Sequence, residues 1–199
     1  MRPGAALIWA AVALVAVVPV AIAAASPLQA GRGAAYVTGG MAGVAALALL
    51  LLQPLLGAGY LPGVNPVQAR RWHRRLGFVL VVAVVLHIGG LFLASPPDTI
   101  DALLLVSPTP FSVYGVIALW SVLLTAVLVA ARKRFRPASW RIAHNGLAAI
   151  VVVATVVHAL MIEGAMGGRS KLILCLCVLA ATAVAILHLR VVRPMLRNR

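Results

Sequence analysis

The chain has 199 residues, of which 63% are hydrophobic and only 10% are charged. A soluble domain is about half apolar and about a quarter charged, so this composition excludes an ordinary globular protein and indicates an integral membrane protein. The formal net charge is +14, because only Asp98, Asp101 and Glu163 are acidic. We interpret this charge as cationic loops on one membrane face and expect no nucleic-acid partner, since the sequence offers no basic face on a soluble element.

Six apolar runs follow one another, each close to the length of about 20 residues that a membrane-spanning helix needs. We therefore predict an all-α membrane protein, a six-transmembrane-helix bundle that forms a single transmembrane domain over residues 1–199. The first run resembles a signal peptide, but its apolar part exceeds the about 7–15 residues of a typical signal, so we expect a retained span. The predicted spans are approximately 5–25, 35–57, 72–94, 111–131, 140–162 and 171–189.

Lysines and arginines are concentrated in alternate loops between these spans. The positive-inside rule then places both termini in the cytoplasm. We accordingly expect a multi-pass protein of a bacterial-type inner (plasma) membrane, in contact with membrane lipid. The opposite side has Arg32, Arg169 and Lys171, together with all three acidic residues. The cations assigned to the cytoplasmic side are Arg2, Arg70, Arg71, Arg74, Arg75, Arg132, Lys133, Arg134, Arg136, Arg141, Arg190, Arg193, Arg197 and Arg199.

Sequence motifs for other kinds of chemistry are absent. Cys175 and Cys177 lie two residues apart in an apolar run, so they point to different sides and form neither a disulfide framework nor a metal site. Without a C-x-x-C-H motif, any haem is held without thioether bonds. The chain also has no G-x-G-x-x-G or P-loop sequence that would indicate a nucleotide-binding module.

Two predicted spans carry a histidine near each end. His73 and His87 lie in the third span, and His144 and His158 lie in the fifth. Fourteen residues of helix separate the imidazoles of one span by about 40° around the axis and about 21 Å along it. Because both spans run in the same direction, they would present two facing imidazole pairs, one near each side of the membrane. Imidazole is a standard axial ligand of haem, so residues 72–162 are predicted to hold two haems.

Other interpretations of these histidines remain open. Flanking arginines make His73 and His144 candidates for ordinary interfacial residues, whereas His87 and His158 lie deeper in their spans, where ionisable groups are rare and by default functional. Zinc or copper fits less well, because a structural zinc site needs four ligands close together. A haem-free transporter would use the same residues as proton relays, but the sequence lacks the inverted repeat typical of that class.

The residues around the histidines suit a flat macrocycle. Small and aliphatic side chains share their helix faces, and Gly77 lowers the bulk beside His73. Trp72 is expected to pack on a porphyrin edge. Basic side chains near the inner pair are expected to neutralise haem propionates; they are Arg71, Arg74, Arg75 and Arg141. We favour an interfacial role for His188 near the end of the sixth span, with a contact to a haem, flavin or quinone as the alternative.

This pattern resembles the ferric reductase-like transmembrane domain. The superfamily includes ferric reductases, NADPH oxidases and the haem-binding membrane subunit of the periplasmic methionine sulfoxide reductase system. The resemblance extends from about Tyr36 to Arg190, and the doubled histidine spacing is its most specific part. The segments that carry it are Arg71-Trp72-His73-Arg74-Arg75-Leu76-Gly77, Leu86-His87, Trp140-Arg141-Ile142-Ala143-His144 and Val157-His158.

The resemblance implies a six-helix bundle with two bis-histidine b-type haems. His73 and His144 would ligate the inner haem, and His87 and His158 the outer haem. Ferric reductases and NADPH oxidases carry a cytoplasmic FAD and NADPH domain, whereas this sequence stops at Arg199. The resemblance therefore implies a separate cytoplasmic flavoprotein, a bound FMN or FAD, or a membrane quinol or quinone as the electron donor.

We predict a haem b-containing membrane protein that moves electrons from a cytoplasmic-side donor to an outer-face acceptor. It would be the transmembrane component of an oxidoreductase, with ferric chelates, oxygen or a periplasmic redox partner as candidate acceptors. Glu163 and the loop that contains Asp98 and Asp101 mark the candidate acceptor side. The principal alternative is a quinol-linked, cytochrome b561-like subunit that anchors a partner oxidoreductase.

Overall fold

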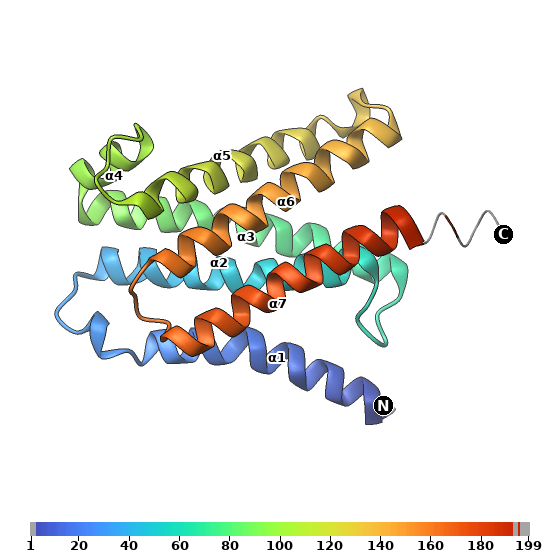
Figure 1. Ribbon diagram of the computed structural model, residues 1–199, viewed down its shortest axis with the longest axis horizontal. Helices are drawn as coiled ribbons and strands as arrows, with labels where there is room; N and C mark the ends of the chain where they lie inside the picture. Colours follow the sequence, from blue (N-terminus) through green and yellow to red (C-terminus); the bar gives the residue numbers. More distant parts are fainter. Residues whose placement is uncertain (1–2, 193–194, 196–199) are drawn as a thin grey trace.

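The computed structural model describes residues 3–192 and 195, and within these residues it is helical, without strands (Figure 1). Six helices are long and apolar enough to cross a membrane, which confirms the predicted all-α, six-span architecture. Four of the cations used to predict the membrane orientation lie outside the described residues: Arg2, Arg193, Arg197 and Arg199. The spans are α1 (Pro3–Ala24), α2 (Ala34–Ala58), α3 (Pro66–Ala94), α5 (Pro110–Ala130), α6 (Pro137–Met161) and α7 (Gly168–Leu187).

Short elements connect the spans. The α4 helix (Pro96–Leu103) lies between α3 and α5, and the single 3₁₀ turns η1 (Pro27–Gln29) and η2 (Arg132–Arg134) precede α2 and α6. A π-helical segment, η3 (His188–Val192), continues α7. Segments of this kind are rare and are frequently found at functional sites.

The third span begins earlier than its apolar run. The hydropathy pattern predicts that the third span starts near residue 72, whereas the helix α3 begins at Pro66. Asn65 caps the helix by accepting hydrogen bonds from the backbone amides of Val67 and Gln68, and the Gln68 side chain accepts from the Asn65 amide in return. This capping box and a proline at the first helical position make the polar first turns helical, although they lack the hydropathy of a span.

The six spans form two antiparallel pairs and a supporting layer. The α2 helix packs along α3, and α5 packs along α6, while α7 contacts α1, α2 and α6. The start of α1 and the end of α7 lie at one end of the bundle, which we call the N/C end; α4 lies at the other, the α4 end (Figure 1). The α3 and α6 helices both run from the N/C end to the α4 end, so their histidines meet level by level (Figure 1).

Close helix packing fixes the register of α2 against α3. A Cβ on Gly90 would lie 2.6 Å from the Cα of Gly39 and 2.7 Å from the carbonyl oxygen of Ala35. The two backbones are therefore in direct contact, as small residues allow in membrane helix pairs. The outward surface is apolar, with 70% of Phe78 and 75% of Leu93 exposed, as expected of side chains that contact lipid.

Candidate functional site

The structure brings the four predicted histidines together as two pairs. The ring centres of His73 and His144 are 6.2 Å apart near the N/C end, and those of His87 and His158 are 6.4 Å apart near the α4 end. The ring planes meet at 76° in both pairs. Two helices, α3 and α6, thus supply one imidazole each to both levels of the bundle.

Three of the four imidazoles are held by main-chain carbonyls. The Nδ1 atoms of His73, His87 and His158 donate hydrogen bonds to the carbonyl oxygens of Gln53 (3.1 Å), Gly39 (2.8 Å) and Phe111 (2.8 Å). A carbonyl oxygen only accepts, so the proton of each neutral ring lies on Nδ1. The Nε2 lone pair is then left free, which is the arrangement that metal-ligating histidines have in proteins.

Glycines make these hydrogen bonds possible at the α4 end. A Cβ on Gly43 would lie 2.7 Å from Nδ1 of His87, and a Cβ on Gly115 would lie 2.8 Å from Nδ1 of His158. Each glycine follows its accepting carbonyl, at Gly39 or Phe111, by one helical turn of four residues. The imidazole therefore occupies the volume of the missing side chain and reaches a carbonyl that any larger residue would cover.

The same arrangement recurs at His73 with more room. Gly57 follows Gln53 by four residues, and a Cβ there would lie 3.8 Å from the His73 ring, which is ordinary contact. The step from Gly39 to Gln53 along α2 is fourteen residues, equal to the step from His87 back to His73 along α3. Antiparallel helices keep their register over such a step, so both histidines of α3 find equivalent carbonyls.

His144 is the exception among the four. Its Nδ1 atom is buried and has no hydrogen-bond partner. In α5, a step of fourteen residues from Phe111 leads to Thr125, which is therefore the counterpart of Gln53 in α2. Val129 follows Thr125 by four residues and so takes the place of Gly57. A branched side chain thus replaces the glycine, and the ring of Trp140 stacks on the imidazole at 4.9 Å and 8°. Packing, rather than a hydrogen bond, orients this histidine.

The geometry fits a metal centre between the rings of each pair. The ring-centre separations of 6.2 and 6.4 Å would allow both imidazoles of a pair to bind one metal ion, since metal–imidazole bonds are about 2 Å long. Extensive contacts join α2 to α3 and α5 to α6, whereas the backbones of α3 and α6 lie farther apart, with the paired imidazoles between them. Two neutral imidazoles per level form a donor set that would suit a haem iron.

The helix faces between the histidines are shielded from the surroundings. Gly77 is half-buried, and the nearest atom to a Cβ on it would belong to the Gln53 side-chain amide, at 3.8 Å. The aliphatic residues on these faces are all buried or half-buried, which gives each pair an apolar environment. They are Leu76, Leu80 and Val84 of α3, and Leu147, Ala148, Val151 and Ala154 of α6.

The predicted basic residues gather at the N/C end, and within the described residues no hydrogen bond joins their side chains to a histidine ring. The four arginines expected beside the inner pair are exposed, and Trp72 has 48% of its surface exposed. The carbonyl of Arg141 accepts a hydrogen bond from the guanidinium of Arg190 at 3.1 Å. A role of these residues toward a cofactor stays a prediction. The four arginines are Arg71, Arg74, Arg75 and Arg141.

The fifth histidine of the chain has a different partner. Nδ1 of His188, in η3, lies 2.6 Å from the hydroxyl of Tyr60, and the two rings stack at 5.5 Å. Tyr60 follows Gly59, which ends α2 with a φ of 73°. The pair therefore joins α2 to the end of α7 at the N/C end of the bundle.

Several residues that contribute to the site cannot be recognised from the sequence alone. Gly43, Gly115 and the accepting carbonyls are recognisable only once the register of the helix pairs is known. One signal is available in retrospect: Gly43 and Gly115 are separated by almost the same interval as His87 and His158. Trp140 precedes His144 by four residues, which places the two rings on one helix face.

Comparison with family models matches residues 42–155 to the family described as ferric reductase like transmembrane component. The match covers more than half of the chain, includes His73, His87 and His144, and ends just before His158. Searches of curated proteins and of solved structures found no match. The chain therefore belongs to the ferric reductase-like transmembrane component family.

Proposed function

We propose that this protein holds two b-type haems and carries single electrons across a membrane. A membrane redox function follows from the family, and six apolar spans make the chain a multi-pass membrane protein. The proposal assigns His73 and His144 to one haem and His87 and His158 to the other. One observation carries it: two imidazole pairs at matching separations, on two parallel helices, at two levels of one bundle.

The residues around each pair have definable tasks. The four Nε2 atoms would bind iron, and a bound haem would supply one-electron chemistry between the ferric and ferrous states. The carbonyls of Gly39, Gln53 and Phe111 fix the tautomer and the orientation of three ligands. The aliphatic faces of α3 and α6 exclude water and lower the local dielectric, which are the means by which a protein sets a haem potential.

The charge distribution supports an orientation. Arg70, the α5–α6 loop and Arg190 lie at the N/C end, whereas Arg32, Arg169 and Lys171 lie at the α4 end. By the positive-inside rule, the N/C end and both termini would then face the cytoplasm of a bacterial-type inner membrane. An interior that is electrically negative favours outward electron movement by about 2.3 kcal/mol per electron for each 100 mV.

Electrons would enter at the N/C end and leave at the α4 end. A flavin, a separate flavoprotein or a quinol is the proposed donor, and a ferric chelate, oxygen or a periplasmic redox partner is the proposed acceptor. Glu163 is exposed at the α4 end, beyond the last turn of α6, where a cationic acceptor could approach. In this scheme the protein is the transmembrane component of an oxidoreductase.

A quinol-linked, cytochrome b561-like anchor subunit is the second candidate. The observation that favours it is the short hydrogen bond between Tyr60 and His188 at the N/C end. Oxidation of a quinol releases protons together with electrons, and a tyrosine–histidine pair is suited to accept a proton. Reduction of the haems by a quinol analogue, but not by a flavin reductase, would favour this candidate.

Single-histidine variants test the ligand assignment. We expect His87→Ala and His158→Ala each to lose one of two haems, measured as haem per purified chain, and to abolish electron transfer across proteoliposomes. His188→Ala is the matched control, because it removes a histidine outside both pairs and should keep both haems. Wild-type haem content in His87→Ala and His158→Ala would refute the assignment.

A further inference from the structure

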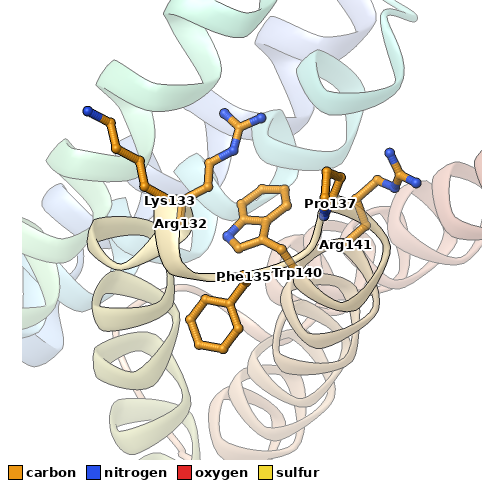
Figure 2. Close-up of a pocket in the computed structure, with 6 residues that line it drawn as sticks. All are labelled: Arg132, Lys133, Phe135, Pro137, Trp140 and Arg141. Atoms are coloured by element: carbon orange, nitrogen blue, oxygen red, sulfur yellow. The ribbon is translucent and has the colours of Figure 1, made fainter.

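The loop between α5 and α6 forms a hollow at the N/C end that the proposed function leaves unassigned. The hollow has a volume of about 370 Å³ and opens to the surface beside the start of α6 (Figure 2). Cationic and aromatic side chains line it together, as Figure 2 shows. The lining residues are Arg132, Lys133, Phe135, Pro137, Trp140 and Arg141.

None of the three acidic side chains of the sequence lies at this hollow. All three acidic residues, Asp98, Asp101 and Glu163, lie at the opposite, α4 end. Arg132, Lys133 and Arg141 are exposed, and the first turn of α6 adds backbone amides without a side-chain cap. A surface of uncompensated cations attracts an anionic partner over about 10 Å at an ionic strength of about 0.1 M.

Two contacts made by the Trp140 ring connect the hollow to the His73–His144 pair. The guanidinium carbon of Arg132 lies 4.9 Å from the centre of the Trp140 ring, and that ring stacks on His144 at 4.9 Å. The indole nitrogen donates to the carbonyl of Leu128 at 3.3 Å, which fixes the ring between the two helices. Trp140 therefore lines the hollow and also contacts a proposed haem ligand.

The composition of the hollow fits a protein surface better than an enclosed ligand. Exposed Arg and Phe side chains around a half-buried Trp in an open depression are typical of protein interfaces. We propose that the α5–α6 loop is the docking site for the acidic face of a soluble, reduced flavoprotein, which delivers electrons to the His73–His144 level beside Trp140. This inference rests on the proposed function and selects one of its donors.

The transfer step balances without further reagents. One electron leaves the reduced flavoprotein, which is oxidised by one electron, and one ferric iron at the His73–His144 level is reduced to ferrous. No bond forms or breaks at Trp140, and no proton is taken up there. The indole shortens the distance that the electron crosses, and Arg132, Lys133 and Arg141 hold the partner in place.

A matched pair of charge reversals tests the docking site. Lys133 lines the hollow, whereas Arg70 is also an exposed cation at the same end of the bundle but belongs to the other helix pair. With reduced flavodoxin as an acidic one-electron protein donor, we expect Lys133→Glu to weaken binding about tenfold at low ionic strength, and Arg70→Glu to change it less than twofold. Binding and the second-order rate of haem reduction are measured in nanodiscs of phosphatidylcholine, at low and high salt.

The outcomes separate this inference from the proposed function. Equal effects of Lys133→Glu and Arg70→Glu, or flavodoxin binding that salt does not weaken, would overturn the docking site. Binding to vesicles of anionic lipid through the hollow, without binding of flavodoxin, would overturn it too and identify a lipid headgroup site. A haem-free chain would refute the proposed function instead, and normal reduction of both variants by dithionite shows that their haems are intact.

Discussion

The two histidine pairs have nearly the same separation and ring angle but are supported differently. At the α4 end, His87 and His158 each donate a 2.8 Å hydrogen bond to a carbonyl across a glycine. At the N/C end, His73 has a longer bond of 3.1 Å, and His144 has none. The comparison shows that helix register sets the distance between ligands, whereas single residues beside each ring set its hydrogen bonding.

The difference in hydrogen bonding follows from one position at which the two otherwise equivalent helix pairs have different residues. The α2–α3 and α5–α6 pairs run in the same directions and place carbonyls at equivalent positions. Three of the four positions have a glycine one turn after the carbonyl, and the fourth has Val129. The chain places Trp140 against His144 instead, so the ligand nearest the proposed donor side is held by an aromatic ring.

The largest expected effect comes from filling the glycine positions of the α4 end. Gly43→Val and Gly115→Val would force atoms into the space that the imidazoles occupy, because a Cβ alone lies 2.7 or 2.8 Å from Nδ1. We expect each variant to lose the haem of the His87–His158 pair, measured as haem per chain. Gly57→Ala is the control, since its Cβ would lie 3.8 Å from His73, and it should retain both haems. Loss of haem in the control alone would contradict the account.

A smaller effect is expected from removing the aromatic support of His144. Trp140→Leu leaves the ligand in place but removes the stacked ring, so His144 gains rotational freedom. We expect a broader range of axial-ligand angles, seen as a broadened low-spin electron paramagnetic resonance signal from one haem, with the other signal unchanged. Trp72→Leu is the comparison, because within the described residues no aromatic contact joins Trp72 to a histidine ring. An unchanged spectrum in Trp140→Leu would show that the stack does not orient the ligand.

The pairs should also differ in reduction potential. A hydrogen bond from Nδ1 to a carbonyl makes the imidazole more basic, which stabilises ferric iron. The His73–His144 haem lacks one such bond and lies near exposed arginines, so we expect it to have the higher potential. If one hydrogen bond is worth about 1 kcal/mol, the difference is about 40 mV or more. A potentiometric titration that assigns the lower potential to the His73–His144 haem would reverse this comparison.

The smallest effect is expected from a variant that gives His144 the hydrogen bond that it lacks. Val129→Gly would copy the arrangement at Gly57 and expose the Thr125 carbonyl to His144. We expect the potential of the His73–His144 haem to fall by about 40 mV, the equivalent of one hydrogen bond of about 1 kcal/mol. Val129→Ala is the control, because it still covers the carbonyl with a Cβ. An equal shift in both variants would indicate altered packing rather than a new hydrogen bond.

Much of this fold is predictable from hydropathy and spacing. Long uncharged runs identify six spans because lipid requires about 20 apolar residues for each crossing. The α3 helix extends six residues before the predicted span of 72–94, because Asn65 and Gln68 form a capping box that a hydropathy pattern does not detect. The family resemblance, based on the histidine segments, is confirmed by the match to residues 42–155.

The candidate site is predictable only in part. The spacing of four histidines is visible in the sequence because a helix repeats at a fixed angle and rise. Their partners depend on which residue of α2 lies opposite which residue of α3, and this register is set by contacts such as that between Gly39 and Gly90. For that reason, only the structure identifies the supporting glycines and shows that Nδ1 of His144 lacks a hydrogen-bond partner.

The central claim is that each imidazole pair binds one haem. The most direct measurement is the haem-to-protein ratio of the purified chain, together with its reduced-minus-oxidised absorbance spectrum. The account predicts two b-type haems per chain with the low-spin spectrum of bis-histidine ligation. A colourless protein that stays haem-free after reconstitution would contradict it.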